Sequence, residues 1–342
     1  MNFKSTQKKL TISLLRKLYG RKKSPFHPGE KPGSIGLMAQ ERFGDIIMMS
    51  PLIRSLHRAY AECRINIISV NKIADYLGYD PAISRVLKAK HPSAEVKRFL
   101  RDQEFDLLVN TKDHPSVTFL YLTGRIRARQ KIGIGHPQHD GFFDHLLSPP
   151  AEASTVQTYL SLLDYLQIAY TEKDFIPYLP EGPVSDQINK FIRTLPENTI
   201  AVNLSASQTY KEWPQNKWAE FLGKLSLPVI IIAMPKQIAA KKELESEFSH
   251  VISSPPTSSI FDAGHLIRHS RILLSPDTAL VHIASCYNTP VVALYRQPLD
   301  LQKFPPFSSK QQVLMSKDQN IASITVPEVL EAFQRLQKDL EC

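Results

Sequence analysis

The chain alternates short apolar runs with stretches in which apolar residues recur every three or four positions. The runs have the length of buried strands, and the periodic stretches have the spacing of amphipathic helices. This alternation predicts an α/β protein with parallel sheets covered by helices on both faces. In the first half we expect strands at 34–39, 64–70, 105–110 and 131–135, and helices at 116–124 and 156–168.

A second alternating series follows a cluster of prolines and a glycine at 177–183, which predicts a linker. At roughly 150 residues per domain, a chain of 342 residues also suggests two domains. We therefore predict two Rossmann-like, doubly wound domains, 34–180 and 185–325, with the C-terminal helix 326–340 packing back on the first. The expected strands of the second domain are 199–204, 228–233, 251–253, 271–275 and 290–295, and its helices are 214–225, 238–248, 260–269 and a stretch from about 279 to 287.

The net charge of +9 is unevenly placed, because residues 1–29 contain no Asp or Glu. Within this arm, defined as residues 1–33, Leu10, Leu14 and Leu18 share one helical face. A basic amphipathic segment either lies on an anionic membrane surface or packs on its own domain as a solvated helix. Both readings stay open. The basic residues are Lys4, Lys8, Lys9, Arg16, Lys17, Arg21, Lys22 and Lys23.

Asp45 follows the first expected strand, in the stretch ERFGDIIMMSPLIRSL. The carboxyl ends of parallel strands are where ligands bind in doubly wound sheets, so Asp45 can face a ligand in the cleft between the domains. It is either an ordinary acid at a helix start or a group that does chemistry. Pro51 leaves two geometries: a kink inside one helix, or the first position of a second helix with Ser50 as its cap.

Asp277, Thr278 and Ala279 occupy the corresponding place after a strand of the second half. Backbone N–H groups at a helix start suit a phosphate, although the same pattern suits Asp277 or Thr278 as a helix cap. Lys211 follows another strand and is either a phosphate-neutralising cation or a surface lysine. His282 lies one turn into the helix, where a structural histidine is the commoner finding.

Arg125, Arg127 and Arg129 alternate along the chain. They either line one face of an extended segment and meet an anionic acceptor, or are solvated.

Several function classes lack support. Histidines and acids between 136 and 145 match no metal-ligand spacing, and His265 and His269 lack the glutamate of a metalloprotease motif. Neither a dinucleotide-binding glycine motif nor a P-loop is present, no recognition motif suggests nucleic acid, and no apolar run could span a membrane. Cysteines at 63, 286 and 342 show no metal spacing and fit a reducing cytoplasm.

Taken in order, these motifs resemble glycosyltransferase family 9, the heptosyltransferase family, from about residue 34 to 340. The residues that carry the resemblance are Gly44-Asp45 with Pro51, FDLLVN with RARQKIGI, SASQTYKEWPQNKWAEF, and LLSPDTALVHIASCYNTPVVALY. The resemblance implies a GT-B fold and an inverting, metal-independent transfer of heptose from ADP-heptose to the anionic inner core of lipopolysaccharide, without a cofactor. It also implies an enzyme at the cytoplasmic face of the inner membrane, which residues 1–24 can contact.

The resemblance assigns roles by position. Asp45 corresponds to the catalytic base and Lys211 to the lysine that neutralises phosphate. Apart from the resemblance, we expect Gly44, Arg125, Arg127 and Arg129 on the acceptor side. The donor-binding positions are Ser205, Lys211, Asp277, Thr278, Ala279, Leu280 and His282.

The chain departs from the family pattern at three places. Ala279 and Arg296 replace glycines, and the segment 235–238 lacks the acid that holds the donor. Two alternatives therefore remain: a GT-B transferase or epimerase that uses another nucleotide sugar, and a binding protein that keeps the fold without turnover.

Overall fold

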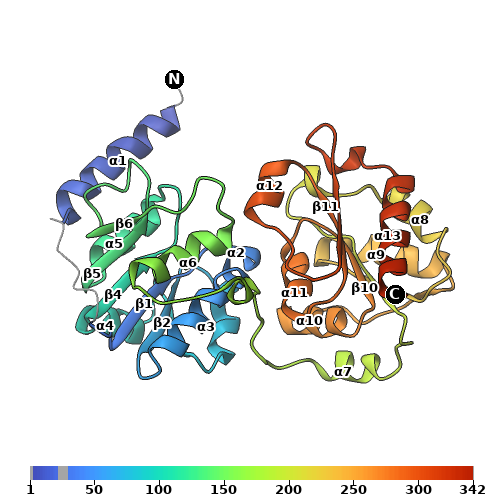
Figure 1. Cartoon of the computed structure of the whole chain (residues 1–342), viewed down its shortest axis with the longest axis horizontal. Coiled ribbons are helices and arrows are strands. Elements are labelled where there is room, and N and C mark those ends of the chain that lie inside the picture. Colours follow the sequence, from blue (N-terminus) through green and yellow to red (C-terminus); the bar gives the residue numbers. More distant parts are fainter. Residues whose placement is uncertain (1–2, 22–29, 342) are drawn as a thin grey trace. The chain divides into compact units, whose positions relative to one another are not determined.

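The computed structural model describes residues 3–21 and 30–341, and the side chains from residue 6 onward. It divides into two compact units, residues 1–175 and 176–342, and each is considered by itself (Figure 1). Each unit is built on one six-stranded sheet. Lys22 and Lys23 of the basic arm lie outside the described residues. Within the described chain, no helix is both long and apolar enough to cross a membrane.

Unit 1 has strands in the order β3-β2-β1-β4-β5-β6, with every neighbouring pair parallel. The order reverses beside β1, so the loops after β1 and β4 border the crevice where ligands bind in such sheets. The strands are β1 (Ser34–Met38), β2 (Arg64–Ser69), β3 (Ile83–Lys88), β4 (Phe105–Asn110), β5 (Ala128–Ile134) and β6 (His145–Leu147). The helices are α1 (Phe3–Tyr19), α2 (Phe43–Ile47), α3 (Ser50–Ala59), α4 (Ala94–Asp102), α5 (Val117–Arg125) and α6 (Thr155–Tyr165), with 3-10 turns η1 (Lys72–Tyr79) and η2 (Glu172–Phe175).

Unit 2 repeats this plan with the parallel order β12-β11-β10-β7-β8-β9. Its reversal lies beside β7, so the loops after β7 and β10 take the equivalent place. The strands are β7 (Ile200–Asn203), β8 (Val229–Ile232), β9 (Val251–Ile252), β10 (Ile272–Pro276), β11 (Val291–Tyr295) and β12 (Gln311–Met315). The helices are α7 (Asp186–Ile192), α8 (Gln215–Leu222), α9 (Ile238–Glu247), α10 (Ile260–Arg268), α11 (Ala279–Tyr287), α12 (Pro298–Lys303) and α13 (Val326–Glu341), with 3-10 turns η3 (Thr209–Lys211), η4 (Pro235–Gln237) and η5 (Ile321–Ser323).

The α/β prediction is confirmed, and every expected strand is present within a few residues of its predicted ends. The central strands were predictable because both of their faces are covered, which makes them continuously apolar. The sequence analysis missed β3, β6 and β12. These strands are at or next to a sheet edge and are short or carry polar residues, so their pattern is weak.

The N-terminal helix α1 packs on α5 of the same unit. Ile12 and Leu15 are buried against Leu120 and the phenylalanines at 142 and 143. A Cβ atom on Gly124 would stand 2.5 Å from Cγ of Tyr19, so glycine permits this close approach. Leu10, Leu14 and Leu18 nevertheless remain 67%, 57% and 64% exposed. The helix is therefore anchored by one side and leaves a second apolar stripe uncovered.

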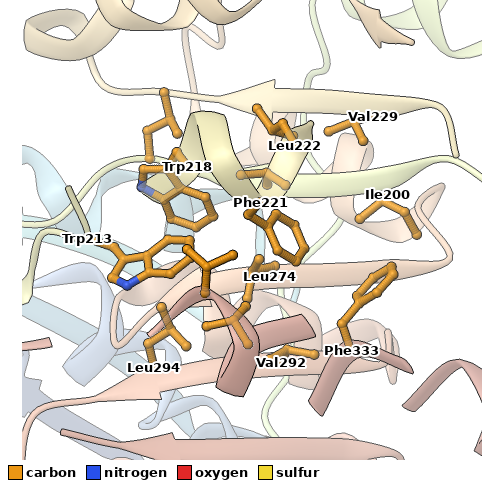
Figure 2. Packing of buried hydrophobic residues seen from close by; sticks show 14 of the residues in the cluster. Ile200, Trp213, Trp218, Phe221, Leu222, Val229, Leu274, Val292, Leu294 and Phe333 are labelled. Atoms are coloured by element: carbon orange, nitrogen blue, oxygen red, sulfur yellow. The ribbon is translucent and has the colours of Figure 1, made fainter. Parts of the chain in front are cut away.

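The C-terminal helix α13 belongs to the core of unit 2. Val329, Phe333 and Leu336 are buried among side chains of the sheet and of α8. Figure 2 shows Phe333 near Phe221 and Val292. The structure buries the apolar face of this helix within unit 2, and packing of the helix on the first domain stays a prediction.

Phe333→Ala should destabilise unit 2 by about 3–5 kcal/mol, because the truncation leaves a cavity against Phe221. Both tryptophans of the chain, Trp213 and Trp218, lie in this core. Urea unfolding followed by tryptophan fluorescence therefore reports on unit 2. Gln334→Ala, at an exposed position of the same helix, should change the stability by less than about 0.5 kcal/mol. Equal effects of the two substitutions would contradict this placement of α13.

Candidate active site

Asp45 lies in the first turn of α2, directly after the loop that follows β1. The chain then turns at Met48 and Met49 and begins α3, with Pro51 in its first turn. Of the two geometries expected for Pro51, the separate turn is found, although Met49 rather than Ser50 precedes the helix. The hydroxyl of Ser50 donates to the carbonyl of Ile47 at 2.7 Å. Asp45 is thus presented by a short helix of its own.

The loops after β1 and β4 are joined by hydrogen bonds. The amide of Gln40 donates to the carbonyl of Thr111 at 2.8 Å, and the Thr111 hydroxyl donates to the carbonyl of Met38 at 2.7 Å. Lys112, in the second loop, is only 6% exposed and pairs with Glu41 at 2.9 Å. Asp45 therefore shares the edge of unit 1 with a buried cation that the sequence analysis did not identify.

The pKa of Asp45 is raised above its ordinary value, mainly because burial disfavours the charged form. The positive charge of Lys112 is the strongest opposing influence, followed by Arg42, while Asp113 raises the pKa further. Asp113 and His114 continue the same loop. A partly exposed carboxylate with a raised pKa and a nearby cation can accept a proton from a hydroxyl group.

The three arginines predicted for the acceptor side lie elsewhere. Arg125 ends α5 and its Nη1 donates to the Tyr121 hydroxyl at 2.8 Å. Arg129 pairs with Glu30 at 3.2 Å and with Asp106, near the start of β4, at 3.4 Å. Arg127 reaches Glu104 at 4.0 Å. They lie at the amino ends of β4 and β5, whereas Asp45 follows the carboxyl end of β1, and their contact with an acceptor stays a prediction.

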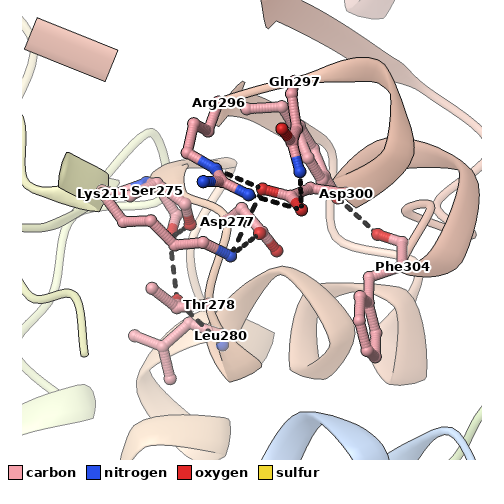
Figure 3. A network of polar contacts seen from close by, with 11 residues as sticks. Lys211, Ser275, Asp277, Thr278, Leu280, Arg296, Gln297, Asp300 and Phe304 are labelled. Atoms are coloured by element: carbon pink, nitrogen blue, oxygen red, sulfur yellow. Dashed lines mark hydrogen bonds and ion pairs between the residues drawn. The ribbon is translucent and has the colours of Figure 1, made fainter. Parts of the chain in front are cut away.

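In unit 2, three neighbouring strands send polar residues from their carboxyl ends into one cluster (Figure 3). Lys211 follows β7, Asp277 follows β10, and Arg296 follows β11. The Lys211 ammonium donates to the Asp277 carboxylate and lies 3.8 Å from an oxygen of Asp300. Burial raises the pKa of Asp277, and Lys211 opposes that rise. The structure thus joins two predicted residues, Lys211 and Asp277, in one buried ion pair.

Thr278 is the N-cap of α11. Its hydroxyl accepts from the N–H of Leu280 at 3.3 Å and from the amide of Asn203 at 3.1 Å. Of the two capping candidates, Thr278 is therefore the one used, which leaves the Asp277 carboxylate for Lys211. Ala279 is the first helical residue and has no positive φ angle, so a glycine is not required there by the backbone.

Ser205 ties the loop after β7 to the loop after β8. Its hydroxyl accepts from the N–H of Met234 at 2.6 Å and donates to Gln237 at 3.1 Å. Glu212 lies at the same loop, since its carboxylate accepts from Lys236 at 2.5 Å and from Gln237 at 3.1 Å. An acid is therefore present beside 235–238 although that segment has none of its own. Sequence reasoning missed Glu212 because the residue comes from a different strand.

His282 is 2% exposed and lies one turn into α11, with its ring 6.0 Å from that of Phe304. Its Nδ1 has no hydrogen-bond partner among the described residues. Burial lowers the pKa of His282 to about 3, and the charge of Lys211 acts in the same direction. The imidazole is therefore neutral at physiological pH.

The other histidine groups make structural contacts. His145 stacks on Tyr165 with ring centroids 4.0 Å apart, and Nδ1 of His139 lies 2.7 Å from the carbonyl of Ile134. His265 and His269 contact each other through their rings at 4.6 Å. Among the described residues, no group of three or more His, Cys, Asp or Glu side chains is arranged to hold a metal ion.

Two sheets of six parallel strands, each with polar groups beyond the carboxyl ends of its central strands, define a fold of the GT-B class. A family model described as glycosyltransferase family 9 (heptosyltransferase) matches residues 93–332. That match covers most of the chain, so the protein belongs to glycosyltransferase family 9 and is an enzyme of the glycosyltransferase class.

Individual relatives agree with this assignment. The chain is 23% identical to lipopolysaccharide heptosyltransferase 3 of Escherichia coli over 280 residues, which cover 74% of this chain and 80% of the relative. It is 21% identical to the lipopolysaccharide core heptosyltransferase OpsX of Haemophilus influenzae, with 85% and 86% covered. Among solved structures, E. coli heptosyltransferase WaaC with ADP matches with a TM-score of 0.69 and 15% identity, over 89% of this chain and 98% of that one. This last likeness shows the fold.

His282 should make the stability of unit 2 depend on pH. The unfolded histidine takes up a proton near pH 6.5, whereas the folded one does so only near pH 3, so folding stability falls as the pH drops through this window. The slope contributed by one proton is about 1.4 kcal/mol per pH unit. Urea unfolding between pH 7 and 4.5 should therefore show a flatter pH dependence for His282→Gln than for the wild type. Parallel curves would show that His282 does not titrate in this way.

Proposed function

We propose that this protein is an inverting, metal-independent heptosyltransferase that moves a heptose from ADP-heptose to the inner core of lipopolysaccharide. The carrying observation is the pair of equivalent sites, Asp45 beyond β1 in unit 1 and the Lys211–Asp277 pair beyond β7 and β10 in unit 2. The names of the relatives support the substrate class, since they are lipopolysaccharide heptosyltransferases, and one solved relative carries ADP.

In the proposed reaction Asp45 accepts the proton of the acceptor hydroxyl. The hydroxyl oxygen forms a bond to the anomeric carbon of the donor sugar while the bond to the nucleotide diphosphate breaks on the opposite face. Negative charge grows on the departing diphosphate. Lys211 and the N–H groups at the start of α11 stabilise that charge, with no metal required in this scheme. Asp277 orients Lys211 before the donor arrives.

A donor other than ADP-heptose is the second candidate, because the acid beside 235–238 is Glu212 and not a residue of that segment. Because Glu212 comes from the loop after β7, its carboxylate would meet the nucleoside at a different position from an acid within 235–238. Thermal unfolding in the presence of ADP, UDP, GDP and CDP distinguishes the donors. Stabilisation by UDP without stabilisation by ADP would favour a transferase or epimerase that uses another nucleotide sugar.

Asp45→Asn should reduce transfer from ADP-heptose to a heptose-deficient lipopolysaccharide acceptor by about 10²–10⁴-fold, because an amide cannot take up the proton. The affinity for ADP should stay unchanged, since the donor groups are on unit 2. Product formation is measured by mass spectrometry and ADP affinity by calorimetry. Asp140→Asn, at an exposed position of unit 1, is the matched control and should retain full activity. Undiminished transfer by Asp45→Asn would show that Asp45 is not the catalytic base.

We also propose that the enzyme is cytoplasmic and contacts the inner membrane peripherally through residues 1–24. The leucine stripe of α1, defined as Leu10, Leu14 and Leu18, is exposed, and Lys17 lies three residues from Leu14 on the same surface. Leucines enter the headgroup boundary while lysines meet anionic lipids. The other side of α1 packs on α5, and α5 follows the loop that bears Lys112. This arrangement attaches the membrane contact to the acceptor-side unit.

Replacement of all three stripe leucines by serine should lower sedimentation of the full chain with phosphatidylglycerol vesicles at least tenfold, because the apolar contact is lost. The melting temperature should not change, since these side chains are exposed. Leu15→Ser, on the buried side of α1, is the contrasting variant and should lower the melting temperature. If the wild type fails to sediment, or the triple variant sediments equally well, the membrane contact is refuted.

A further inference from the structure

Arg296 adds a second cation to the cluster of unit 2. Its Nε donates to Asp300 at 3.0 Å and its Nη2 donates to the same carboxylate at 3.4 Å. The guanidinium carbon lies 4.8 Å from the centroid of the Tyr210 ring. Tyr210 directly precedes Lys211 in the turn η3, so Arg296 stacks on the turn that carries Lys211.

The cations and the carboxylates of this cluster are equal in number. Lys211 contacts both Asp277 and Asp300, and Arg296 contacts Asp300. Gln297 also donates to Asp300 at 3.0 Å. Without a ligand the charges of the four ionic side chains therefore compensate one another. A ligand that brings two further negative charges would compete with the carboxylates for both cations.

The guanidinium is suited to such an exchange. Its side chain is 23% exposed, so it is accessible, whereas the carboxylate that holds it is 16% exposed. The bonds to Asp300 use Nε and Nη2, and Nη1 has no hydrogen-bond acceptor among the described residues. The flat fork of arginine matches two phosphate oxygens at once, and stacking on Tyr210 limits the positions it can take.

We propose that Arg296 is a binding residue for the diphosphate of the donor, and that Asp300 holds it in place until the donor arrives. This inference rests on the proposed function insofar as the ligand is a nucleoside diphosphate sugar. Lys211 and Arg296 would then each contact the diphosphate from a different strand of the sheet. Two cations also offset the charge that develops on the leaving group better than one.

A merely structural Arg296–Asp300 pair predicts a different result from a ligand-exchanging pair. If the pair is structural, loss of either partner weakens the site in the same direction. If Asp300 competes with the diphosphate, Asp300→Asn frees Arg296 and leaves Lys211 paired with Asp277 alone, whereas Arg296→Gln removes one of the two cations. Arg296→Gln should then weaken diphosphate binding, whereas Asp300→Asn should not.

The test is calorimetric titration of the full chain with ADP and with AMP. Arg296→Gln should weaken ADP binding at least tenfold and AMP binding less than threefold, because the guanidinium addresses the second phosphate. Asp300→Asn should bind ADP as tightly as the wild type or more tightly. Arg335→Gln is the matched control, since Arg335 also pairs with an acid four residues away, Glu331, but on the exposed face of α13. It should leave both affinities unchanged.

The inference is overturned if Arg296→Gln binds ADP within threefold of the wild type, if it weakens ADP and AMP equally, or if Asp300→Asn loses as much ADP affinity as Arg296→Gln. Pyrophosphate serves as a probe that is independent of the nucleoside. If the wild type binds pyrophosphate but not ADP, the proposed donor fails, and the same variants are compared with pyrophosphate. If the wild type binds neither, Arg296 has no diphosphate role. Thermal unfolding of each variant confirms that it is folded.

Discussion

Every strand in both sheets is parallel to its neighbours, and this constraint decides where chemistry can lie. Parallel strands are connected by helices that cover both faces of the sheet, so polar groups are excluded from the faces and collect at the strand ends. The carboxyl ends meet at one edge. Residues far apart in sequence, such as Lys211, Asp277 and Arg296, therefore become neighbours without any local signal that joins them.

Buried charges at these edges come in compensated groups, because an isolated charge is expensive to desolvate. Asp277 is paired with Lys211, and Lys112 with Glu41. In both units the pairing also prepares the site for a ligand: a carboxylate in reach of a cation on one unit, and cations in reach of an anionic ligand on the other. In our proposal a diphosphate replaces the carboxylates as the partner of the cations in unit 2.

The sequence was sufficient to locate residues whose position depends only on the strand that they follow. Strand-to-helix turns after continuous apolar runs could be located, and Asp45, Lys211 and Asp277 were found at such turns. It failed where the role depends on a partner from another strand. Glu212 and Lys112 gave no local pattern. The alternation of the arginines at 125–129 does not mark one extended face, because the segment changes from helix to strand, with Arg125 bonded to Tyr121 and Arg129 paired with Asp106.

The sequence by itself determined the α/β class, the two alternating series of elements and the family, because periodicity and motif order are properties of the chain. Only the tertiary structure decided which face of each amphipathic helix is covered. It placed α13 in the core of unit 2 through Phe333, and it docked α1 by Ile12 and Leu15 while leaving Leu10 exposed. An apolar stripe indicates that a helix buries one face. The surface that covers this face forms only when elements distant in sequence pack together.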